Sequence, residues 1–309
     1  RREEGAQPLF GGAGGLGETR HARRFGPWAA IRQAGLAGAP GRAIWRGVES
    51  GTAGTAPLAA GIGRSLRIYY GDAARAARMD RLYVRFLRPG ALAFDVGAHV
   101  GDRTACFRRL GARVVAMEPQ PAALRALRLI HGRDAGVALV GAALGAAEGR
   151  ASLRVNVRNP TVSTLSDGFV AAASAAEGWH GERWPGLARV PVTTLDALID
   201  THGRPDFVKI DVEGTEDAVL AGLSRAVPAL SFEVTTIHRQ AALDALDRLA
   251  RLGPYRVALS LGERFDLPDE WCGCDEMADR IARLPDSANS GDVYAVRDGA
   301  CLVPSGAAG

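Results

Sequence analysis

Short apolar runs alternate with helical segments along most of this 309-residue chain, and this alternation restricts the fold more than any other feature. An apolar run of about four to eight residues, rich in β-branched side chains and bounded by glycine or proline, is typical of a buried strand. On this basis we expect strands at residues 92–96, 114–117, 137–144, 152–157, 190–193, 207–212, 230–234, 256–261 and 293–297.

Apolar side chains recur every three or four positions between these runs, which predicts helices. The expected helices lie at 72–87, 103–110, 121–130, 195–199, 216–224 and 241–252. Strands and helices in alternation predict an α/β fold, with a mostly parallel sheet covered by helices on both faces. Ligands bind such sheets beyond the carboxyl ends of the strands, so residues that follow the strands are the candidates for a site.

The first 63 residues break this pattern. They contain 15 of the 39 glycines and show no sustained strand or helix period. Such a segment buries too little apolar surface to offset its ordering entropy. We therefore expect a largely disordered leader at 1–63, with a short helix at 25–37, a folded domain at 64–302 and a flexible tail at 303–309.

The positive charge belongs to the leader. Residues 1–64 hold nine arginines and four glutamates, a net +5, so the formal net charge of +4 leaves −1 for the remainder. A near-neutral body argues against a nucleic-acid partner, and no apolar run reaches the ~18 residues that a membrane span needs. The cysteines lack the spacing of a zinc site, and there is no signal-peptide pattern. We expect a cytoplasmic protein with free thiols and no bound metal.

A loop with two glycines follows the first expected strand and leads into a helix: Asp95-Val-Gly97-Ala98-His99-Val-Gly101. Glycines let a backbone turn tightly and approach a ligand, and a helix N-terminus follows them. The spacing Gly-x-x-x-Gly is not the dinucleotide fingerprint Gly-x-Gly-x-x-Gly. The carboxylate of Asp95 would repel a pyrophosphate but could accept hydrogen bonds from a ligand amine. A simple strand-to-helix turn is the alternative.

Two further strands end in charged residues. Glu118 follows the second strand, where a carboxylate can bind both hydroxyls of a ribose or merely be solvated. Lys209, the only lysine beside 37 arginines, shares one face with Asp211 and Glu213 if its strand runs to residue 212. Charges are costly in a core unless they are paired. We expect all three to face a cleft; the alternative is a buried lysine–carboxylate pair that supports the sheet.

These motifs and two others occur in one order along the chain: Asp95-Val-Gly-Ala-His-Val-Gly101, Glu118-Pro, Val192-Thr-Thr-Leu-Asp196, Lys209-Ile-Asp-Val-Glu-Gly214 and Phe232-Glu233. Over roughly residues 66–300 the chain resembles the FkbM family of S-adenosylmethionine-dependent methyltransferases. The resemblance implies a Rossmann-like, class I methyltransferase fold, with a seven-stranded, mostly parallel sheet, its last strand antiparallel, and helices on both faces. It also implies O-methylation of a sugar, glycan or polyketide hydroxyl. His99 departs from the family, which more often has asparagine there.

The resemblance also implies which residues hold the cofactor. They are Asp95, Gly97, Ala98 and Gly101 around its methionyl part, Glu118 at the ribose, and Ala142 and Ala143 near the adenine.

An alcohol that accepts a methyl group loses a proton, so a positioned base should help. Asp211 and Glu213 are our first candidates for orienting or deprotonating the acceptor, with Lys209 tuning them by pairing. His180 and His238 are alternative bases. A metal ion on Asp211 and Glu213 is conceivable, but the sequence offers no clear third ligand.

Glu233 ends the next strand and should face the same cleft. The insertion that carries Trp179 and Trp184 either caps the active site or is anchored to the body by these side chains. Two other functions remain open, a nucleotide-dependent oxidoreductase and a binding module without catalysis. The glycine spacing and Asp95 argue against the first, and the presence of both Asp95 and Glu118 argues against the second.

Overall fold

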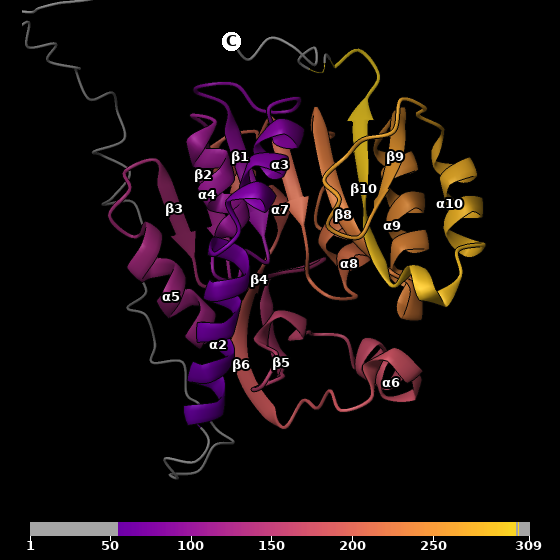
Figure 1. Cartoon of the computed structure of the whole chain (residues 1–309). Coiled ribbons are helices and arrows are strands. Elements are labelled where there is room, and N and C mark those ends of the chain that lie inside the picture. The colour runs from indigo at the N-terminus through magenta and orange to yellow at the C-terminus, as the bar shows by residue number, and fades with distance from the viewer. Residues whose placement is uncertain (1–54, 301, 303–309) are drawn as a thin grey trace, which may run out of the picture. The chain divides into compact units, whose positions relative to one another are not determined.

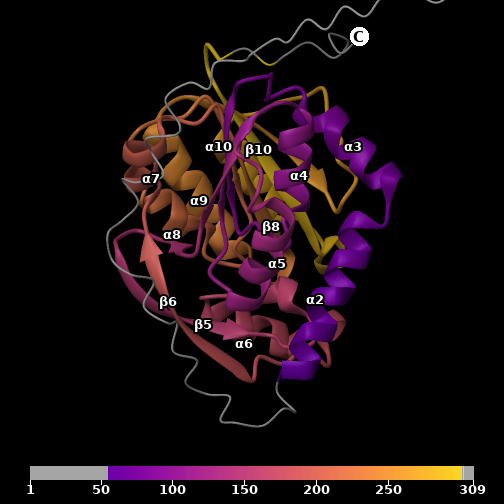
Figure 2. The ribbon, with the colours of Figure 1, turned by 90° about the vertical axis from the view of Figure 1, so that its left-hand side faces the viewer.

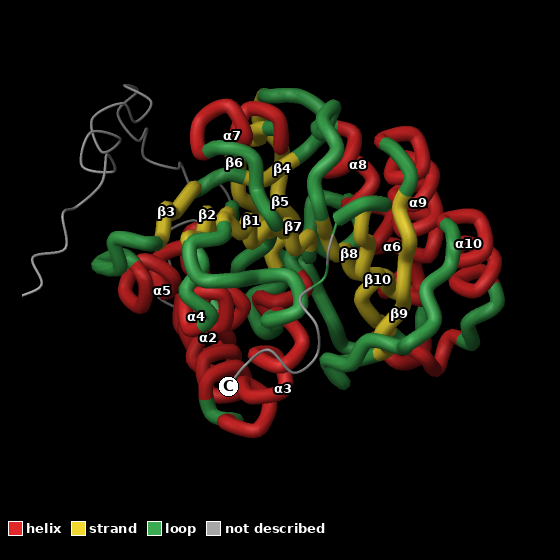
Figure 3. The backbone as a smooth tube through the Cα atoms, turned by 90° about the horizontal axis from the view of Figure 1, so that it is seen from above, coloured by secondary structure: helices red, strands yellow, loops and turns green. Residues whose placement is uncertain are grey.

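The computed structural model describes residues 55–300 and 302, and its central element is a seven-stranded sheet (Figure 1). In spatial order the strands are β3 (Val137–Val140), β2 (Arg113–Met117), β1 (Leu92–Val96), β7 (Phe207–Ile210), β8 (Ala229–Thr235), β10 (Ser290–Arg297) and β9 (Tyr255–Leu261), the row that Figure 3 shows from above. The strands from β3 to β8 pair in parallel, whereas β10 runs antiparallel to both neighbours. The predicted class I methyltransferase fold is thereby confirmed.

Helices cover both faces of the main sheet (Figure 2). On one face lie α3 (Ala73–Tyr83), α4 (Asp102–Arg109) and α5 (Pro121–His131), with α2 (Thr55–Tyr70) alongside α5. On the other lie α7 (Leu195–His202), α8 (Glu216–Ala221), α9 (Arg239–Leu252) and α10 (Cys274–Ala282). Each layer buries an apolar core against the sheet, with Phe107 and Phe207 in one core and Phe94 and Phe232 in the other.

A second, three-stranded sheet lies beyond the carboxyl ends of the parallel strands (Figure 1). It consists of β4 (Ala143–Leu144), β6 (Gly186–Thr193) and β5 (Gly149–Val155), and the insertion between β5 and β6 carries α6 (Asp167–Ala175). The single strand predicted at 137–144 is therefore wrong, because the chain leaves the main sheet after β3. A side chain at Gly141 would come within 2.8 Å of Leu124, so the chain passes close to α5 at this break.

The folded part begins earlier than the sequence predicts. Helix α2 starts at Thr55, and its side chains Leu58 and Ile62 are buried against the small sheet and α5, respectively. Residues 55–63 are therefore helical, which corrects the expected boundary at residue 63. The helix predicted at 25–37 and the tail at 303–309 lie outside the described residues.

None of the helices at residues 55–300 is long and apolar enough to cross a membrane.

Strand register gathers charged side chains on one face of the main sheet. Lys209 on β7 lies opposite Asp95 on β1, and Asp292 on β10 lies opposite Glu233 on β8. Alternate residues of a strand share a face, and Ala93, Phe207 and Tyr294, each two positions from a charged residue, belong to the core that also holds residues of α3 and α4. The four charged residues therefore lie on the α3–α4 side of the sheet, near the carboxyl ends of the parallel strands.

Candidate active site

Two cavities open at the carboxyl edge of the main sheet. The first, which we call the apolar cavity, lies between the ends of β1 and β2 and the small sheet, with walls that include Val96, Met117, Leu144, Leu153 and Leu165. About 560 Å³ of space that is open to solvent lies between these walls.

Glu118 is the carboxylate that the end of β2 presents to the apolar cavity. It is 5% exposed, and its two oxygens accept hydrogen bonds from the backbone N–H groups of His99 (2.8 Å) and Gln120 (2.6 Å). Burial raises the pKa of Glu118 to about 7, even though these two donors favour the charged form. A carboxylate has about four acceptor positions, so Glu118 retains the capacity to bind ligand hydroxyls.

Gly97 joins the loop after β1 to the end of β7. Its φ is +80°, and a Cβ at this position would lie 1.8 Å from the backbone oxygen of Asp211. The backbone N–H of Asp211 donates to the carbonyl of Val96 (3.0 Å), which fixes the same crossing from the other side. Only glycine fits here, because any side chain would separate the two strand ends.

His99 lies where the apolar cavity meets a second cavity, and it lines both. Its φ is +49°, a left-handed conformation that asparagine and histidine adopt more readily than most residues. The backbone at this position therefore accommodates histidine or asparagine. Burial lowers the pKa of His99 to about 4, so its ring is neutral, and its buried Nε2 has no hydrogen-bond partner.

The second cavity, which we call the acidic cavity, is lined by seven acidic side chains and one arginine, Arg103. The acidic residues are Asp95, Asp102, Asp211, Glu213, Glu233, Glu263 and Asp292. Gly97, His99, Asp211 and Glu213 line both cavities, so a ligand in one can reach the other.

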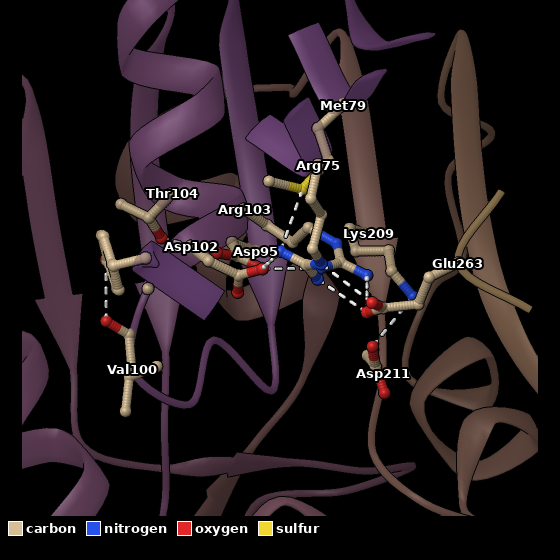
Figure 4. Close-up of polar contacts among 12 residues, drawn as sticks. Arg75, Met79, Asp95, Val100, Asp102, Arg103, Thr104, Lys209, Asp211 and Glu263 are labelled. Carbon is tan, nitrogen blue, oxygen red and sulfur yellow. Dashed lines mark hydrogen bonds and ion pairs between the residues drawn. The ribbon is translucent and has the colours of Figure 1, made fainter. Parts of the chain in front are cut away.

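Arginines pair with two of these acids. Arg75 lies between Asp102 (2.8 Å) and Glu263 (2.6 Å), and Arg103 also contacts Asp102 (2.7 Å), as Figure 4 shows.

Asp95 instead accepts a hydrogen bond from the Thr104 hydroxyl at 2.5 Å. Burial raises the pKa of Asp95 to about 6, although this hydroxyl opposes the shift.

Lys209 is completely buried beneath the acidic cavity and is not part of its lining. Its Nζ lies 2.7 Å from Asp292 and 3.2 Å from Asp211, the contact that Figure 4 shows. Burial alone would lower the pKa of Lys209, but the two carboxylates outweigh it and raise the pKa above its ordinary value. Burial likewise favours a higher pKa for Asp211, yet the ammonium group holds it below the usual range. The structure thus shows the buried pair that was the alternative to a cleft-facing lysine, together with the predicted contact to Asp211.

A turn after β7, rather than strand alternation, presents Asp211 and Glu213. The strand ends at Ile210, not at residue 212, and Glu213 has a left-handed backbone with φ +59°. The Thr164 hydroxyl donates to the Glu213 carbonyl (2.6 Å), and the Gly214 N–H donates to the buried carboxylate of Glu216 (3.1 Å). These two contacts fix the turn and therefore the positions of both acids.

Glu233 joins these two acids across the sheet. One carboxylate oxygen from each of Asp211, Glu213 and Glu233 lies within 4.8 Å of the others. Glu213 is 8% exposed, and no hydrogen bond reaches its carboxylate from any residue that the structure describes; Oε2 of Glu233 is also buried without a partner. Burial, and then the neighbouring negative charges, raise the pKa of both glutamates well above its ordinary value.

The other residues expected at the cofactor divide between the cavities. Ala142 and Ala143 line the apolar cavity, and Ala98 lines the acidic one. Gly101 lines neither, because it faces α5, where a Cβ would come within 2.5 Å of Leu127.

The alternative bases His180 and His238 line neither cavity. In the insertion, Trp179 packs edge-on against Phe169, and the Trp184 ring N–H donates to the Val162 carbonyl (2.7 Å), so both tryptophans contact other residues of the insertion itself.

Sequence reasoning did not single out several residues that line the acidic cavity, among them Arg103, Thr161 and Asp292. Arg103 follows the glycine loop directly, which is a usable signal. Asp292 is an isolated acid in an apolar strand, the same pattern that drew attention to Lys209. Thr161 lies in the insertion, where no periodicity indicates its position.

The family model described as the methyltransferase FkbM domain matches residues 95–257, more than half of the chain. Hexuronic acid methyltransferase AglP of Haloferax volcanii is 28% identical over 148 residues, which are 47% of this chain and 55% of that protein. The chain thus matches only about half the length of this curated relative.

Solved structures of methyltransferases are also similar to the chain. Precorrin-6y C5,15-methyltransferase from Geobacter metallireducens has a TM-score of 0.39 at 16% identity and covers 72% of this chain and 87% of its own. Magnesium protoporphyrin IX methyltransferase from Synechocystis has a TM-score of 0.38 at 12% identity and covers 77% and 84%. At these low TM-scores we base the fold assignment on the strand order alone.

Proposed function

Since this chain belongs to the FkbM methyltransferase family and its cofactor is S-adenosylmethionine, we propose that it methylates a hydroxyl oxygen of a sugar or glycan. The observation that carries the proposal is the junction of the two cavities, where Gly97, Asp211 and Glu213 are shared. The apolar cavity suits the cofactor, and the polar one suits a hydroxyl-rich acceptor. The curated relative is named for a hexuronic acid, which favours a sugar over a polyketide acceptor.

The apolar cavity has the chemistry that the cofactor requires. Leu144 and the small residues Ala142 and Ala143 leave room for a flat apolar ring. Glu118 offers carboxylate oxygens for the two ribose hydroxyls. Gly97 lines both cavities, the one that holds Glu118 and the one that holds Asp95. We assign these residues, with Ala98 near the methionyl part, to cofactor binding.

S-adenosylmethionine supplies a methyl group that is already electrophilic because it is bonded to a sulfonium sulfur. The protein's main tasks are to hold the acceptor oxygen in line with that methyl group and to remove the hydroxyl proton. Asp211 and Glu213 are the carboxylates that line both cavities. We propose that they orient the acceptor hydroxyl and that one of them takes its proton, while Lys209 keeps Asp211 in place.

Isothermal titration of the full chain with S-adenosylhomocysteine, beside NAD as a negative control, tests the cofactor assignment. We expect the first ligand alone to bind. Glu118→Ala should weaken binding, whereas Glu148→Ala, which removes an exposed carboxylate that lines neither cavity, should not. A folded sample that binds no S-adenosylhomocysteine would contradict the proposal.

The acceptor is tested separately by mass spectrometry, with a gain of one methyl group as the readout. Hexuronic-acid glycans, neutral glycans and polyketide alcohols form the panel. We expect methylation of a glycan, and methylation of the polyketide alcohols alone would contradict the assignment of a sugar acceptor.

A further inference from the structure

The acidic cavity contains more negative charge than its own cations balance. Arg75 and Arg103 compensate Asp102 and Glu263, and the Thr104 hydroxyl satisfies one oxygen of Asp95. Lys209 forms ion pairs with both Asp292 and Asp211, so one positive charge faces two carboxylates. No cation lies within ion-pair distance of Glu213 or Glu233 in the part of the chain that the structure describes.

These two glutamates point at each other and at Asp211 instead of avoiding contact. Their oxygens lie within 4.8 Å of one another, Glu213 is 92% buried without a hydrogen bond, and Oε2 of Glu233 is buried without a partner. Buried polar groups are nearly always satisfied, and an unsatisfied one in a native fold indicates an ion, a water or a ligand. Like charges at this distance make a positive ligand the natural partner.

We propose that Asp211, Glu213 and Glu233 bind a divalent cation such as Mg²⁺ or Mn²⁺, and that this cation holds oxygen atoms of the acceptor. Carboxylate oxygens are the ligands that hard divalent cations prefer. Lys209 contacts Oδ2 of Asp211 and leaves Oδ1 for the ion. In the proposed reaction, this cation is the group that would bind the acceptor. The cation site itself does not depend on the proposed function; only the role given to the bound cation rests on it.

The backbone holds the three ligands before any ion arrives. Asp211 is fixed through the β1 carbonyl of Val96, Glu213 through the Thr164 hydroxyl, and Glu233 lies within the strand β8. A site built on rigid elements keeps its geometry when empty. Three protein oxygens supply half of an octahedral shell, so the remaining positions face the acidic cavity and are available to acceptor oxygens.

A cation also explains how a sugar acid could enter this cavity. A hexuronic acid carries a carboxylate, which the uncompensated acidic side chains of this cavity would repel. A divalent ion on three of them reverses the local charge and binds two neighbouring oxygens of the acceptor. It also favours loss of the proton from a coordinated hydroxyl. The cluster thus predicts an acceptor that chelates, through a diol or through a hydroxyl beside a carboxylate.

Mn²⁺ binding by the full chain, freed of metal with EDTA and then dialysed, tests the site without any need for activity. Bound Mn²⁺ is counted by the loss of the free-ion EPR signal. We expect one ion per chain, and we expect Glu233→Gln and Glu213→Gln each to weaken it roughly ten- to hundredfold. Glu276→Gln on α10, where the glutamate is exposed and paired only with Arg280, is the matched control and should bind as the wild type does.

Thermal unfolding guards against variants that merely misfold. Each glutamine removes one of three mutually repelling carboxylates, so both variants should melt at or above the wild-type temperature in EDTA. Mn²⁺ should raise the melting temperature of the wild type but not that of the variants. A wild type that binds no Mn²⁺, or variants that bind it as tightly as the wild type, would overturn the inference.

Titration with S-adenosylhomocysteine in EDTA separates this inference from the proposed function. Binding of S-adenosylhomocysteine without any binding of Mn²⁺ overturns the cation and leaves the methyltransferase assignment standing. A protonated amine on the acceptor would then be the partner of the cluster. Binding of Mn²⁺ to the predicted ligands without binding of S-adenosylhomocysteine supports the cation site and contradicts the cofactor pocket.

Discussion

The two cavities share one sheet edge, yet they treat their carboxylates in opposite ways. In the apolar cavity, both oxygens of Glu118 are held by backbone N–H groups. In the acidic cavity, no described residue donates such a hydrogen bond to Glu213 or Glu233. In the apolar cavity, the protein itself supplies the donors for its carboxylate, which suits a cofactor that is the same in every reaction. The acidic cavity has too little positive charge of its own, so a ligand must supply it.

Lys209 offers the most severe test of this contrast, because it is a fully buried cation that pairs with two carboxylates of the acidic cavity. Lys209→Met leaves Asp292 and Asp211 without their counter-charge, and we expect the free energy of unfolding to fall by about 3–5 kcal/mol. Urea denaturation measures it. In samples that remain folded, S-adenosylhomocysteine should bind with nearly wild-type affinity, because no residue specific to the apolar cavity is changed.

The double variant Lys209→Met/Asp292→Leu controls for the loss of packing at Lys209. Removing the stranded carboxylate should recover a large part of the lost stability, since a buried ion pair replaced by apolar groups is often nearly neutral. If Lys209→Met alone had the same free energy of unfolding as the wild type, the ion pairs of Lys209 would not stabilise the fold, contrary to what their distances indicate.

Gly97 lines both cavities, so a substitution there should affect the ligands of both. Gly97→Ala forces a Cβ against the Asp211 carbonyl at a φ of +80°, and we expect a loss of about 2–3 kcal/mol in unfolding free energy. S-adenosylhomocysteine and Mn²⁺ binding should both weaken, because Gly97 lines both cavities. Gly149→Ala on β5, where a Cβ meets no atom within 4 Å, is the control and should stay within about 0.5 kcal/mol. Loss of one ligand alone would show that the cavities are independent.

The sequence predicts most of the main sheet because its strands are short, apolar and punctuated by glycine. The predicted bounds of β1 match the structure, and those of β2 differ by one residue. Helix α2 was missed because Gly61 and Gly63 interrupt its pattern, yet Gly61 is needed because a Cβ there would come within 2.7 Å of Pro160. The break between β3 and β4 has no signal beyond Gly141, because it depends on how closely the chain passes α5.

The residues of the candidate site, like the elements of the fold, could be predicted from the sequence only in part. Asp95, Glu118 and Asp211 could be chosen because each follows an apolar strand, and strand ends meet at one edge. The partners of these residues could not, since pairing of Lys209 with Asp292 depends on β10 inserting next to β8. The third acid of the cluster, Glu233, was expected at the same cleft, but only the register between β7 and β8 brings it to Asp211 and Glu213.

The smallest expected effect concerns Glu118 and sharpens the contrast through pH. Its folded-state pKa of about 7 lies above the ordinary 4.5, so the native chain holds this proton more tightly than the unfolded chain does. The stability that results is fully present below pH 4.5 and is lost as pH rises through about 7. Ribose hydroxyls would donate to the ionised form, so affinity for S-adenosylhomocysteine should rise about tenfold between pH 6 and 8.

Glu118→Gln should flatten this rise, since an amide does not titrate, and should therefore bind more weakly than the wild type at pH 8 while differing little at pH 6. Titrations in excess EDTA keep the acidic cavity free of metal, and Glu148→Gln serves as the exposed control. A wild-type affinity that does not change with pH would mean that the ligand does not contact the Glu118 carboxylate. If the affinity of Glu118→Gln rose with pH as much as that of the wild type, the titrating group would be Asp95, whose pKa of about 6 lies in the same pH range. The pH-dependent contact would then belong to the acidic cavity.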